Sequence, residues 1–276
     1  MILHMKTKQY DLRKQTLIMG ILNATPDSFS DGGKYNTIET AVAQAKQMVE
    51  DGADIIDIGG ESTRPDHEPI SAEEEINRVI PVIEAVKQAV KIPLSIDTYK
   101  AATAEAAIEA GVELINDIWG AKKDPHMAEV AAKHDVPIVL MHNRDHTSYH
   151  SIMEDLIHEL EESVAIAKKA GVKDEQIILD PGIGFGKTLA DNYTVLGQME
   201  KITNQLSYPL LLGTSRKSFI TEVLDIPAEQ RDNATGATTC IGIQKGANII
   251  RVHDVKRNRE LASMTERILQ GASTVG

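Results

Sequence analysis

The chain has 276 residues, of which 42% are hydrophobic and only 4% are aromatic. This length suits one large domain, and the composition predicts a core built mainly of aliphatic side chains. A formal net charge of −12 argues against nucleic acid as a partner, because phosphate backbones attract basic surfaces.

The sequence also indicates a protein that resides in a reducing compartment and does not span a membrane. Cys240 is the only cysteine, so no disulfide can form within the chain. No apolar run approaches the roughly 20 residues that a bilayer-spanning helix needs. The first residues, Met1 to Gln15, carry charges and lack the apolar centre of a secretory signal. We therefore expect a cytoplasmic protein that has no membrane partner.

Short apolar runs recur along the chain, and each is followed by a helical pattern. Because these runs are apolar throughout rather than alternating, they predict parallel strands buried on both faces. The segment Met5–Gln15 precedes the first run and predicts a small hairpin that closes the floor of the fold. In chain order the eight runs are Thr16–Leu22, Ile55–Gly59, Pro93–Ile96, Glu113–Ile118, Pro137–Met141, Gln176–Leu179, Pro209–Leu212 and Asn248–Val252.

The segments between the runs carry helix start and stop signals. Glycines where left-handed C-terminal caps are needed precede several strands. Two serine–glutamate pairs have the spacing of an N-terminal capping box. The glycines are Gly52, Gly111, Gly171 and Gly246, and the pairs are Ser71 with Glu74 and Ser151 with Glu154.

Eight alternating strand and helix units predict an α/β fold, a single-domain (β/α)8 TIM barrel over residues 1–276. A doubly wound open sheet is the alternative, because alternation alone does not prove closure. Polar residues follow nearly every strand rather than one switch point, which favours the barrel. In a barrel these strand ends form the active site.

One group of strand-end residues is acidic and polar. Asp97, Asn116 and Asp180 should point into the barrel mouth, where a buried carboxylate is costly unless it is paired. A ligand with several N–H donors, such as a 2-amino-4-oxo heterocycle, would satisfy them. The alternative is that these acids form internal salt bridges with Lys217 or Arg251.

A second group is basic and follows the last two strands. Lys217, Ser218, Arg251 and His253 lie where this fold usually binds phosphate. Lys217 and Ser218 are predicted to open a helix, whose free N–H groups favour an anion. The alternative is a solvated helix start beside a surface arginine.

Two other patterns carry less weight. Gly182–Thr188 ends like a nucleotide-binding P-loop, but Pro181 stands where the first glycine is required, so we interpret it as a flexible strand-to-helix loop. No histidine pair has zinc-ligand spacing. Cys240 is interpreted as a small core residue.

The motifs at the strand ends follow the chain from the first strand to the last. They are Asn23–Gly33 (NATPDSFSDGG), Asp57–Pro65 (DIGGESTRP), Ser95–Thr98 (SIDT), Asn116–Trp119 (NDIW), Asp180–Lys187 (DPGIGFGK), Gly213–Ser218 (GTSRKS) and Arg251–Asp254 (RVHD). In this order they resemble bacterial dihydropteroate synthases, members of the pterin-binding barrel family. The resemblance covers nearly the whole chain, and its most specific parts are the first two motifs and Ser215–Ser218.

The resemblance implies a (β/α)8 barrel that joins 4-aminobenzoate to 7,8-dihydropterin-6-ylmethyl diphosphate, releasing diphosphate and forming dihydropteroate for folate synthesis. Loss of diphosphate would leave a stabilised cation, which the neutral aniline nitrogen attacks. No activated protein nucleophile is then needed. The family also implies Mg²⁺ as a cofactor and a homodimer.

The resemblance also implies a role for each matching residue. The pterin ring would be held by Asp97, Asn116, Asp180 and Lys217, with Ile118, Met141 and Phe185 packed on it and Gly213 beside it. Asn23 would contact the Mg²⁺ bound to diphosphate, while Arg251 and His253 would hold the diphosphate itself. Phe29, Asp31, Thr63, Arg64, Pro65, Lys217 and Ser218 would reach the substrates or build the aminobenzoate pocket. The catalytic set would be Lys217, Asp97, Asp180, Arg251, His253, Phe29 and Asp31.

Two alternatives and one departure remain. Methyltetrahydrofolate-dependent methyltransferases share the pterin-binding barrel but need no site for a diphosphate leaving group. A non-catalytic pterin- or phosphate-binding protein would keep the pocket without turnover. Asp66 stands where the family usually has glycine, which leaves the affinity for aminobenzoate and sulfonamides open.

Overall fold

The strands predicted from the sequence are present to within one or two residues at each end. The computed structural model describes residues 1–24, 34–61 and 68–271, and for residues 34–37 it describes the backbone only. The barrel strands are β3 (Leu17–Asn23), β4 (Ile55–Gly59), β5 (Leu94–Asp97), β6 (Leu114–Asp117), β7 (Ile138–Met141), β8 (Ile177–Asp180), β9 (Leu211–Leu212) and β10 (Ile249–Val252).

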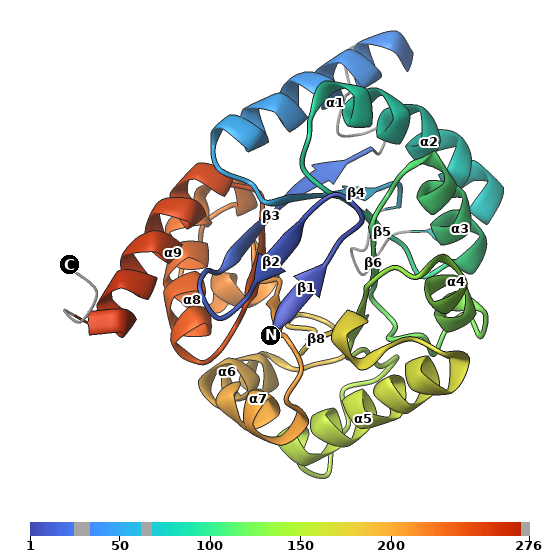
Figure 1. Cartoon of the computed structure of the whole chain (residues 1–276). Helices are drawn as coiled ribbons and strands as arrows, with labels where there is room; N and C mark the ends of the chain where they lie inside the picture. Colours follow the sequence, from blue (N-terminus) through green and yellow to red (C-terminus); the bar gives the residue numbers. More distant parts are fainter. Residues whose placement is uncertain (25–33, 62–67, 272–276) are drawn as a thin grey trace.

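These strands pair in parallel in the order β8-β7-β6-β5-β4-β3-β10-β9. A parallel bridge between Leu179 and Leu210 then joins β8 to the start of β9. This contact closes the sheet into a barrel and excludes the open doubly wound alternative. Figure 1 looks along the barrel and shows the helices as a ring around the strands.

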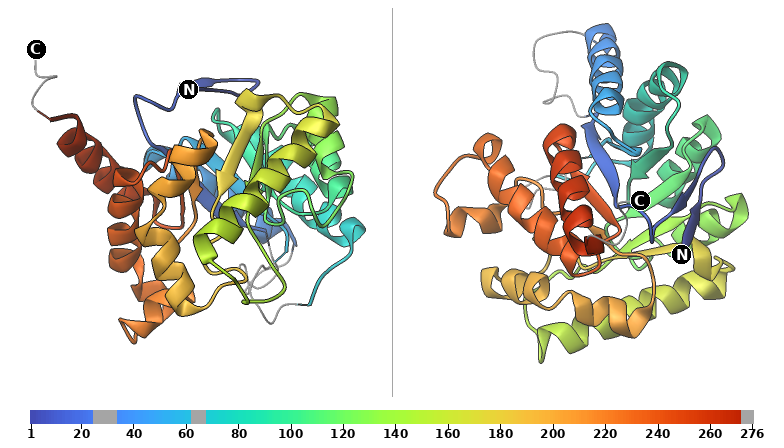
Figure 2. Two further views of the ribbon diagram at one scale, coloured as in Figure 1. Left: turned by 90° about the horizontal axis from the view of Figure 1, so that it is seen from below. Right: turned by 60° about the vertical axis from the view of Figure 1, so that its left-hand side comes forward.

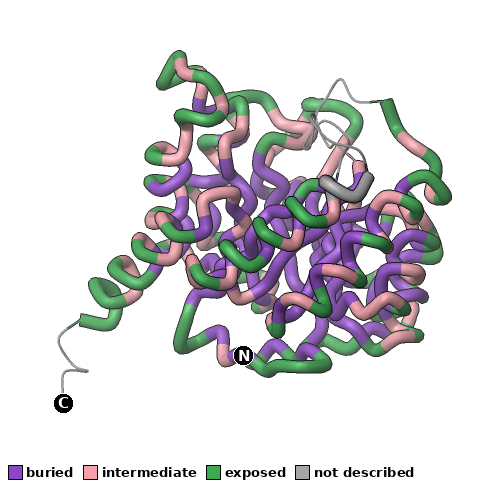
Figure 3. The backbone as a smooth tube through the Cα atoms, turned by 90° about the horizontal axis from the view of Figure 1, so that it is seen from above, coloured by how far each residue is buried: buried purple, intermediate pink, exposed green. Residues whose placement is uncertain are grey.

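Helices follow the barrel strands and cover the outside of the sheet. They are α1 (Lys34–Glu50), α2 (Ala72–Ala89), α3 (Ala101–Ala110), α4 (Met127–His134), α5 (Ile152–Ala170), α6 (Leu189–Gly197), α7 (Glu200–Leu206), α8 (Asp232–Gln244) and α9 (Val255–Gln270). The buried residues form the centre of the molecule in Figure 3, with the exposed ones on the outer faces of the helices. Most of the core lies between strands and helices.

The predicted helix signals are only partly confirmed. Gly111 and Gly171 take left-handed conformations as C-terminal caps, with φ of 114° and 103°. The Ser71 hydroxyl accepts a hydrogen bond from the Glu74 N–H at 3.1 Å, as its spacing predicts. Ser151 occupies the N-cap position of α5, but its side chain makes no capping hydrogen bond.

A hairpin closes the floor of the barrel, as predicted, although it begins before Met5. Its strands are β1 (Ile2–His4) and β2 (Gln9–Asp11), which pair antiparallel with Leu3 opposite Tyr10. Leu3 and Tyr10 belong to an inner core that also contains inward-facing strand residues such as Leu17 and Ile249. Figure 2 shows the hairpin across one end of the molecule. The polar strand ends therefore lie at the other end.

Candidate active site

Strand pairing brings the polar residues of the middle strands to one rim. In the register of the sheet, Gly59 pairs with Asp97, Asp97 with Asn116, and Met141 with Asp180. Because inward and outward side chains alternate along a strand, Asp97 faces inward with Ser95. The sequence predicted this grouping correctly for Asp97, Asn116 and Asp180, all of which are buried.

Arg251 connects the acidic group to the last barrel strand. Its Nε lies 2.6 Å from Asp57 Oδ2, and its Nη2 lies 2.6 Å from Asp97 Oδ2. Asn116 Nδ2 donates to the same Asp57 oxygen at 2.9 Å. Of the two interpretations left open, the structure supports an internal ion pair for Asp97, formed with Arg251. The acidic and basic groups expected from the sequence are thus joined into one network.

Asp57 is the residue of this network that sequence reasoning missed. It lies in the middle of β4 and is fully buried. The sequence prediction places candidate side chains only at strand ends, whereas Asp57 lies two residues before the end of β4. An aspartate inside an otherwise apolar strand was the signal, because such a group must find a partner in the barrel.

Some polar atoms in this network have no protein partner in the described part of the chain. They are Asp57 Oδ1, Asp97 Oδ1 and Ser95 Oγ, all of which are buried. Buried oxygens without partners are rare in proteins because they lose their hydrogen bonds to water. Two of these three atoms are carboxylate oxygens, which accept hydrogen bonds. The interior of the rim is therefore suited to a ligand that donates N–H groups.

Asp180 lies across the rim from this network and beside a glycine. Its Oδ1 accepts a hydrogen bond from the Gly182 N–H at 2.7 Å. A Cβ built on Gly213 would lie 3.8 Å from Asp180 Oδ2, so the glycine leaves the space beside the carboxylate free of a side chain. Burial raises the pKa of Asp180, although the Lys217 charge opposes the shift.

Lys217 extends over the segment that follows Asp180. Its Nζ donates a hydrogen bond to the Ile183 carbonyl oxygen and lies 4.5 Å from the centre of the Phe185 ring. Burial lowers the pKa of Lys217 to about 8, although the nearby Asp180 carboxylate opposes the shift. Charge, aromatic ring and acid are thus next to one another, as a site for a polar heterocycle requires.

Burial also perturbs Asp97 strongly. It raises the pKa of Asp97 to about 7, against the attraction of Arg251. Burial opposes the charge on Arg251, but the carboxylates of Asp57 and Asp97 outweigh it and raise the pKa of the guanidinium. Perturbed acids and bases that converge at one place are typical of a functional site.

His253 follows directly after β10, and it lies next to Ser215. Its Nδ1 is 2.9 Å from Ser215 Oγ, and the same hydroxyl accepts a hydrogen bond from the His253 N–H at 3.1 Å. The two contacts between His253 and Ser215 fix the backbone at the end of β10 and orient the imidazole. Nearby in sequence, Ser218 is exposed and Lys217 is half-buried.

A helix begins at Ser218 with Lys217 before it, as expected, but it is a 3₁₀ helix rather than an α-helix. The structure has a 3₁₀ helix at Ser218–Glu222, and the next α-helix, α8, begins only at Asp232. Pro227 interrupts the segment between them, and proline disfavours helical conformation in the residue before it. A helix of five residues gives little dipole for an anion, so Arg251 and His253 are better candidates for that task.

The apolar side chains expected around the ligand differ in exposure. Met141 is buried at the end of β7, while Ile118 and Phe185 are half-buried. Asn23 ends β3 with an exposed side chain. Phe29, Asp31, Thr63, Arg64, Pro65 and Asp66 lie outside the described residues.

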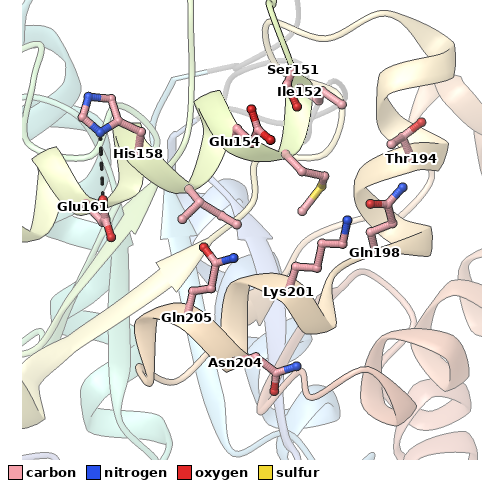
Figure 4. Close-up of a pocket in the computed structure, with 12 residues that line it drawn as sticks. Ser151, Ile152, Glu154, His158, Glu161, Thr194, Gln198, Lys201, Asn204 and Gln205 are labelled. Atoms are coloured by element: carbon pink, nitrogen blue, oxygen red, sulfur yellow. Dashed lines mark ion pairs between the residues drawn. The ribbon is translucent and has the colours of Figure 1, made fainter.

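A separate groove on the outside of the barrel contains none of these residues. It has a volume of about 610 Å³ and lies between α5 and the helices α6 and α7. Figure 4 shows Glu154 and His158 on one side and Gln198 and Lys201 on the other. It shares no residue with the rim, and we assign no function to it.

Comparison with known proteins points to one kind of enzyme. The family model described as pterin binding enzyme matches residues 19–253. Dihydropteroate synthase from Clostridium beijerinckii is 58% identical over 96% of this chain and 98% of its own length. The Bacillus subtilis dihydropteroate synthase is 56% identical over 97% of this chain and 94% of its own length.

Solved structures agree with the sequence matches. A dihydropteroate synthase from Clostridium difficile, crystallised in the presence of pteroic acid, has a TM-score of 0.93 and 50% identity over 95% of this chain and all of its own. The Xanthomonas albilineans dihydropteroate synthase with 4-aminobenzoic acid has a TM-score of 0.92 and 38% identity over 100% of this chain and 99% of its own. The similarity therefore extends over the whole barrel.

Proposed function

The chain belongs to the family of pterin-binding enzymes and, within it, to the dihydropteroate synthases of folate synthesis, and we propose that it performs their reaction at the rim described above. Its substrates are a pterin and an aminobenzoate. The observation that carries the assignment to this rim is the pair of buried carboxylates, Asp57 and Asp97, each with an oxygen that has no partner in the described chain.

The pterin ring would lie among Asp97, Asn116 and Asp180. Its amino and ring N–H groups would donate to the carboxylates, and Lys217 would donate to its carbonyl oxygen or ring nitrogen. This arrangement is supported by the inward position of the acids and by the Lys217 charge near Phe185. Ile118, Met141 and Phe185 would pack on the ring, and Gly213 would leave room for its edge.

The leaving diphosphate would be held by Arg251 and His253. As the bond from the pterin methylene carbon to the diphosphate oxygen breaks, its electron pair leaves with the diphosphate. The Arg251 guanidinium and the hydrogen-bonding imidazole of His253 would then stabilise the charge that develops. The carboxylates of Asp97 and Asp180, which would contact the pterin ring, would favour the positive charge that remains on it. The aniline nitrogen of 4-aminobenzoate attacks the carbon, forms the new C–N bond and loses one proton.

The expected Mg²⁺ site fits the chemistry of the residue at the end of β3. Asn23 is exposed there, and its side chain carries an amide oxygen, a ligand of the kind that Mg²⁺ prefers. Mg²⁺ takes few protein ligands and keeps water and phosphate oxygens. Mg²⁺ held by Asn23 and the diphosphate would supply Lewis-acid stabilisation of the leaving group.

Residues outside the described part of the structure complete the proposal from the resemblance alone. Phe29, Asp31, Thr63, Arg64 and Pro65 would cover the reacting carbon and help to bind 4-aminobenzoate, together with Ser218. Excluding water there would prevent hydrolysis of the cation. Ser218 is exposed at the rim and so accessible to a second substrate.

Diphosphate release tests the proposed reaction directly. The protein is mixed with 7,8-dihydropterin-6-ylmethyl diphosphate, 4-aminobenzoate and Mg²⁺, and each component is omitted in turn. We expect release that needs all three, with dihydropteroate formed in equal amount. Lys217→Ala and Asp180→Asn should each remove turnover while the barrel stays folded. Tight pterin binding without release would instead support a methyltransferase or a non-catalytic binder.

We also infer that the enzyme is a cytoplasmic homodimer that binds neither nucleic acid nor membranes. Among the described residues, no helix is long and apolar enough to cross a membrane. The surface that supports a dimer lies on α8 and α9, where Ile241, Met264 and Ile268 are exposed. Met264 and Ile268 lie one turn apart on α9, and neighbouring exposed apolar side chains commonly mark protein interfaces. The C-terminal half of α9 extends beyond the barrel in Figure 2.

A further inference from the structure

The segment 182–187, interpreted from the sequence as a flexible loop, is packed tightly against the loop after β7. Gly182 and Gly186 have positive φ angles of 66° and 53°. A Cβ on Gly182 would lie 1.9 Å from the His142 carbonyl oxygen, and one on Gly186 would lie 2.6 Å from the Arg144 carbonyl oxygen. Backbone contacts this close admit only glycine. The segment therefore has a defined shape.

The Lys187 side chain stabilises this conformation through hydrogen bonds to carbonyl oxygens of the same segment. Its Nζ lies 2.9 Å from the Gly182 carbonyl oxygen, 3.0 Å from the Phe185 carbonyl oxygen and 2.8 Å from His142 Nδ1. Burial lowers the pKa of Lys187 to about 7, and in its ammonium form the side chain has three hydrogens for these three acceptors. Lys187 thus ties both ends of the turn to a residue that follows another strand.

His142 is suited to be the third acceptor. Its side chain is fully buried, and its Nε2 lies 3.1 Å from Glu159 Oε2, without the alignment of a hydrogen bond. A carboxylate on that side favours a proton on Nε2, which leaves the lone pair of Nδ1 for Lys187. Burial lowers the pKa of His142 to about 2, so the ring stays neutral.

The turn that Lys187 holds also contacts the proposed pterin site. Lys217 donates to the Ile183 carbonyl oxygen of the same turn, and its Nζ lies 4.5 Å from the centre of the Phe185 ring. The two lysines therefore hold one turn between them. A change in the Phe185 carbonyl position would move both its ring and the acceptor of Lys217.

We propose that Lys187, supported by His142, is a positioning residue for pterin binding: it holds the 182–187 turn so that Phe185 and Lys217 meet the ring. The proposal rests on the proposed function, because it needs the pterin to bind at this rim. Lys187 does not act on the reacting carbon. Its removal should weaken binding of the pterin and leave the diphosphate site unaltered.

Lys187→Met tests this, since methionine keeps much of the chain length but donates no hydrogen bond. The probes are 7,8-dihydropterin-6-ylmethanol, which lacks the diphosphate, and inorganic diphosphate with Mg²⁺, each titrated by calorimetry. We expect the Kd of the pterin probe to rise about tenfold or more, as for a lost charged hydrogen bond, and that of diphosphate to stay unchanged. In turnover assays the KM for the pterin substrate should rise more than kcat falls. Lys201→Met, at an exposed lysine on α7, is the matched control and should change neither constant.

Variants of His142 separate positioning from general damage and also serve if Lys187→Met does not fold. His142→Asn keeps a polar acceptor near the Nδ1 position and should retain most pterin affinity, whereas His142→Leu should lose it. The double variant Lys187→Met with His142→Leu should bind the pterin probe no more weakly than the single variant with the lower affinity. The reason is that both substitutions remove the same contact between Lys187 and His142.

Unchanged pterin affinity in folded Lys187→Met, or equal losses for pterin and diphosphate, would overturn the proposal. Equal effects of His142→Asn and His142→Leu would also count against it. Failure of the wild-type protein to bind the pterin probe or to release diphosphate would instead refute the proposed function. The two failures are therefore distinguishable.

Discussion

Arg251 illustrates how one side chain serves two needs at the rim. In the structure its guanidinium forms ion pairs with Asp57 and Asp97, and the same group is proposed to bind the diphosphate of the substrate. Its Nε bond to Asp57 fixes the stem of the guanidinium, and its Nη2 contacts the more exposed Asp97. Asp57 therefore sets the position from which Arg251 meets a substrate.

Replacing Asp57 with asparagine should reveal this role. Asp57→Asn removes the charge opposite Arg251 Nε, and a charged hydrogen bond is worth about 1.5–3 kcal/mol. We expect kcat/KM for the pterin diphosphate to fall by about tenfold to a hundredfold. The matched control is Asp54→Asn, which breaks an ion pair between Asp54 and Arg259. It should lower stability and leave kcat/KM unaltered, and the reverse pattern would contradict the role of Asp57.

The perturbed groups of the rim also predict how activity depends on pH. The pKa of Asp97 is raised to about 7, so the carboxylate that accepts N–H groups forms as pH rises through 7. The pKa of Lys217 is lowered to about 8, so its charge is lost as pH rises through 8. We expect kcat/KM for the pterin substrate to reach a maximum between these values.

Lys217→Arg separates the two limbs of this profile. A guanidinium stays charged throughout the range of the assay, so the fall above pH 8 should disappear even if the rate is lower. The rise through pH 7 should remain, since Asp97 is unchanged. An alkaline fall that persists in Lys217→Arg would show that another group causes it.

At the scale of elements, the hairpin closes the barrel and stabilises its interior. Leu3 is fully buried within the inner core, and the Tyr10 hydroxyl donates to the Asp54 carbonyl oxygen at 2.7 Å. Without the hairpin, the apolar floor of the barrel would face water. Its residues lie far from the polar rim, so it can be altered without touching the site.

Leu3→Ala should therefore lower the free energy of unfolding by about 2–5 kcal/mol, the usual cost of a cavity at a buried leucine. Urea titration followed by circular dichroism measures it. Ile2→Ala, at the neighbouring side chain that is 43% exposed, is the control and should change stability by less than about 0.5 kcal/mol. Catalytic constants below the unfolding range should stay at the wild-type values in both variants.

The helices show that not every local sequence signal is realised in the folded structure. The pair Ser71 and Glu74 forms its capping hydrogen bond, while Ser151 with the same spacing does not. The segment after Lys217 forms only a short 3₁₀ helix at Ser218–Glu222, and the next α-helix begins at Asp232. Motif spacing therefore indicates where a helix starts better than how it is capped or how long it runs.

At the scale of the whole molecule, the proposed dimer concerns the outside of the barrel. The polar rim is built from strand ends of one chain, whereas Met264 and Ile268 lie one turn apart on α9 and are 61% and 66% exposed. Burying these side chains against a second copy would remove apolar surface from water. The dimer and the reaction should therefore be separable by mutation.

Combining Met264→Lys with Ile268→Glu should convert a dimer into a monomer. Sedimentation velocity at micromolar protein measures the mass, and diphosphate release measures activity. We expect the monomer to keep most of the wild-type kcat. Ile2→Lys, at an exposed apolar residue on the hairpin, is the control and should leave the mass of the assembly unchanged. A wild-type monomer, or a double variant that stays dimeric, would contradict the proposed surface.

The sequence by itself determined the strands, their order and the polar residues at their ends. Each of these follows from local chemistry: an apolar run makes a strand, and a polar residue after it reaches the rim. The inward positions of Asp97, Asn116 and Asp180 could therefore be predicted. The resemblance of the motifs then supplied the reaction, which the comparisons support.

Only the tertiary structure decided which of these residues are partners. Barrel closure depends on the bridge between Leu179 and Leu210, and Arg251 meets Asp97 and Asp57 across sequence separations of 154 and 194 residues. Local patterns carry no information about contacts over such distances. For the same reason Lys187 looked like part of a loop, until the fold placed His142 beside it.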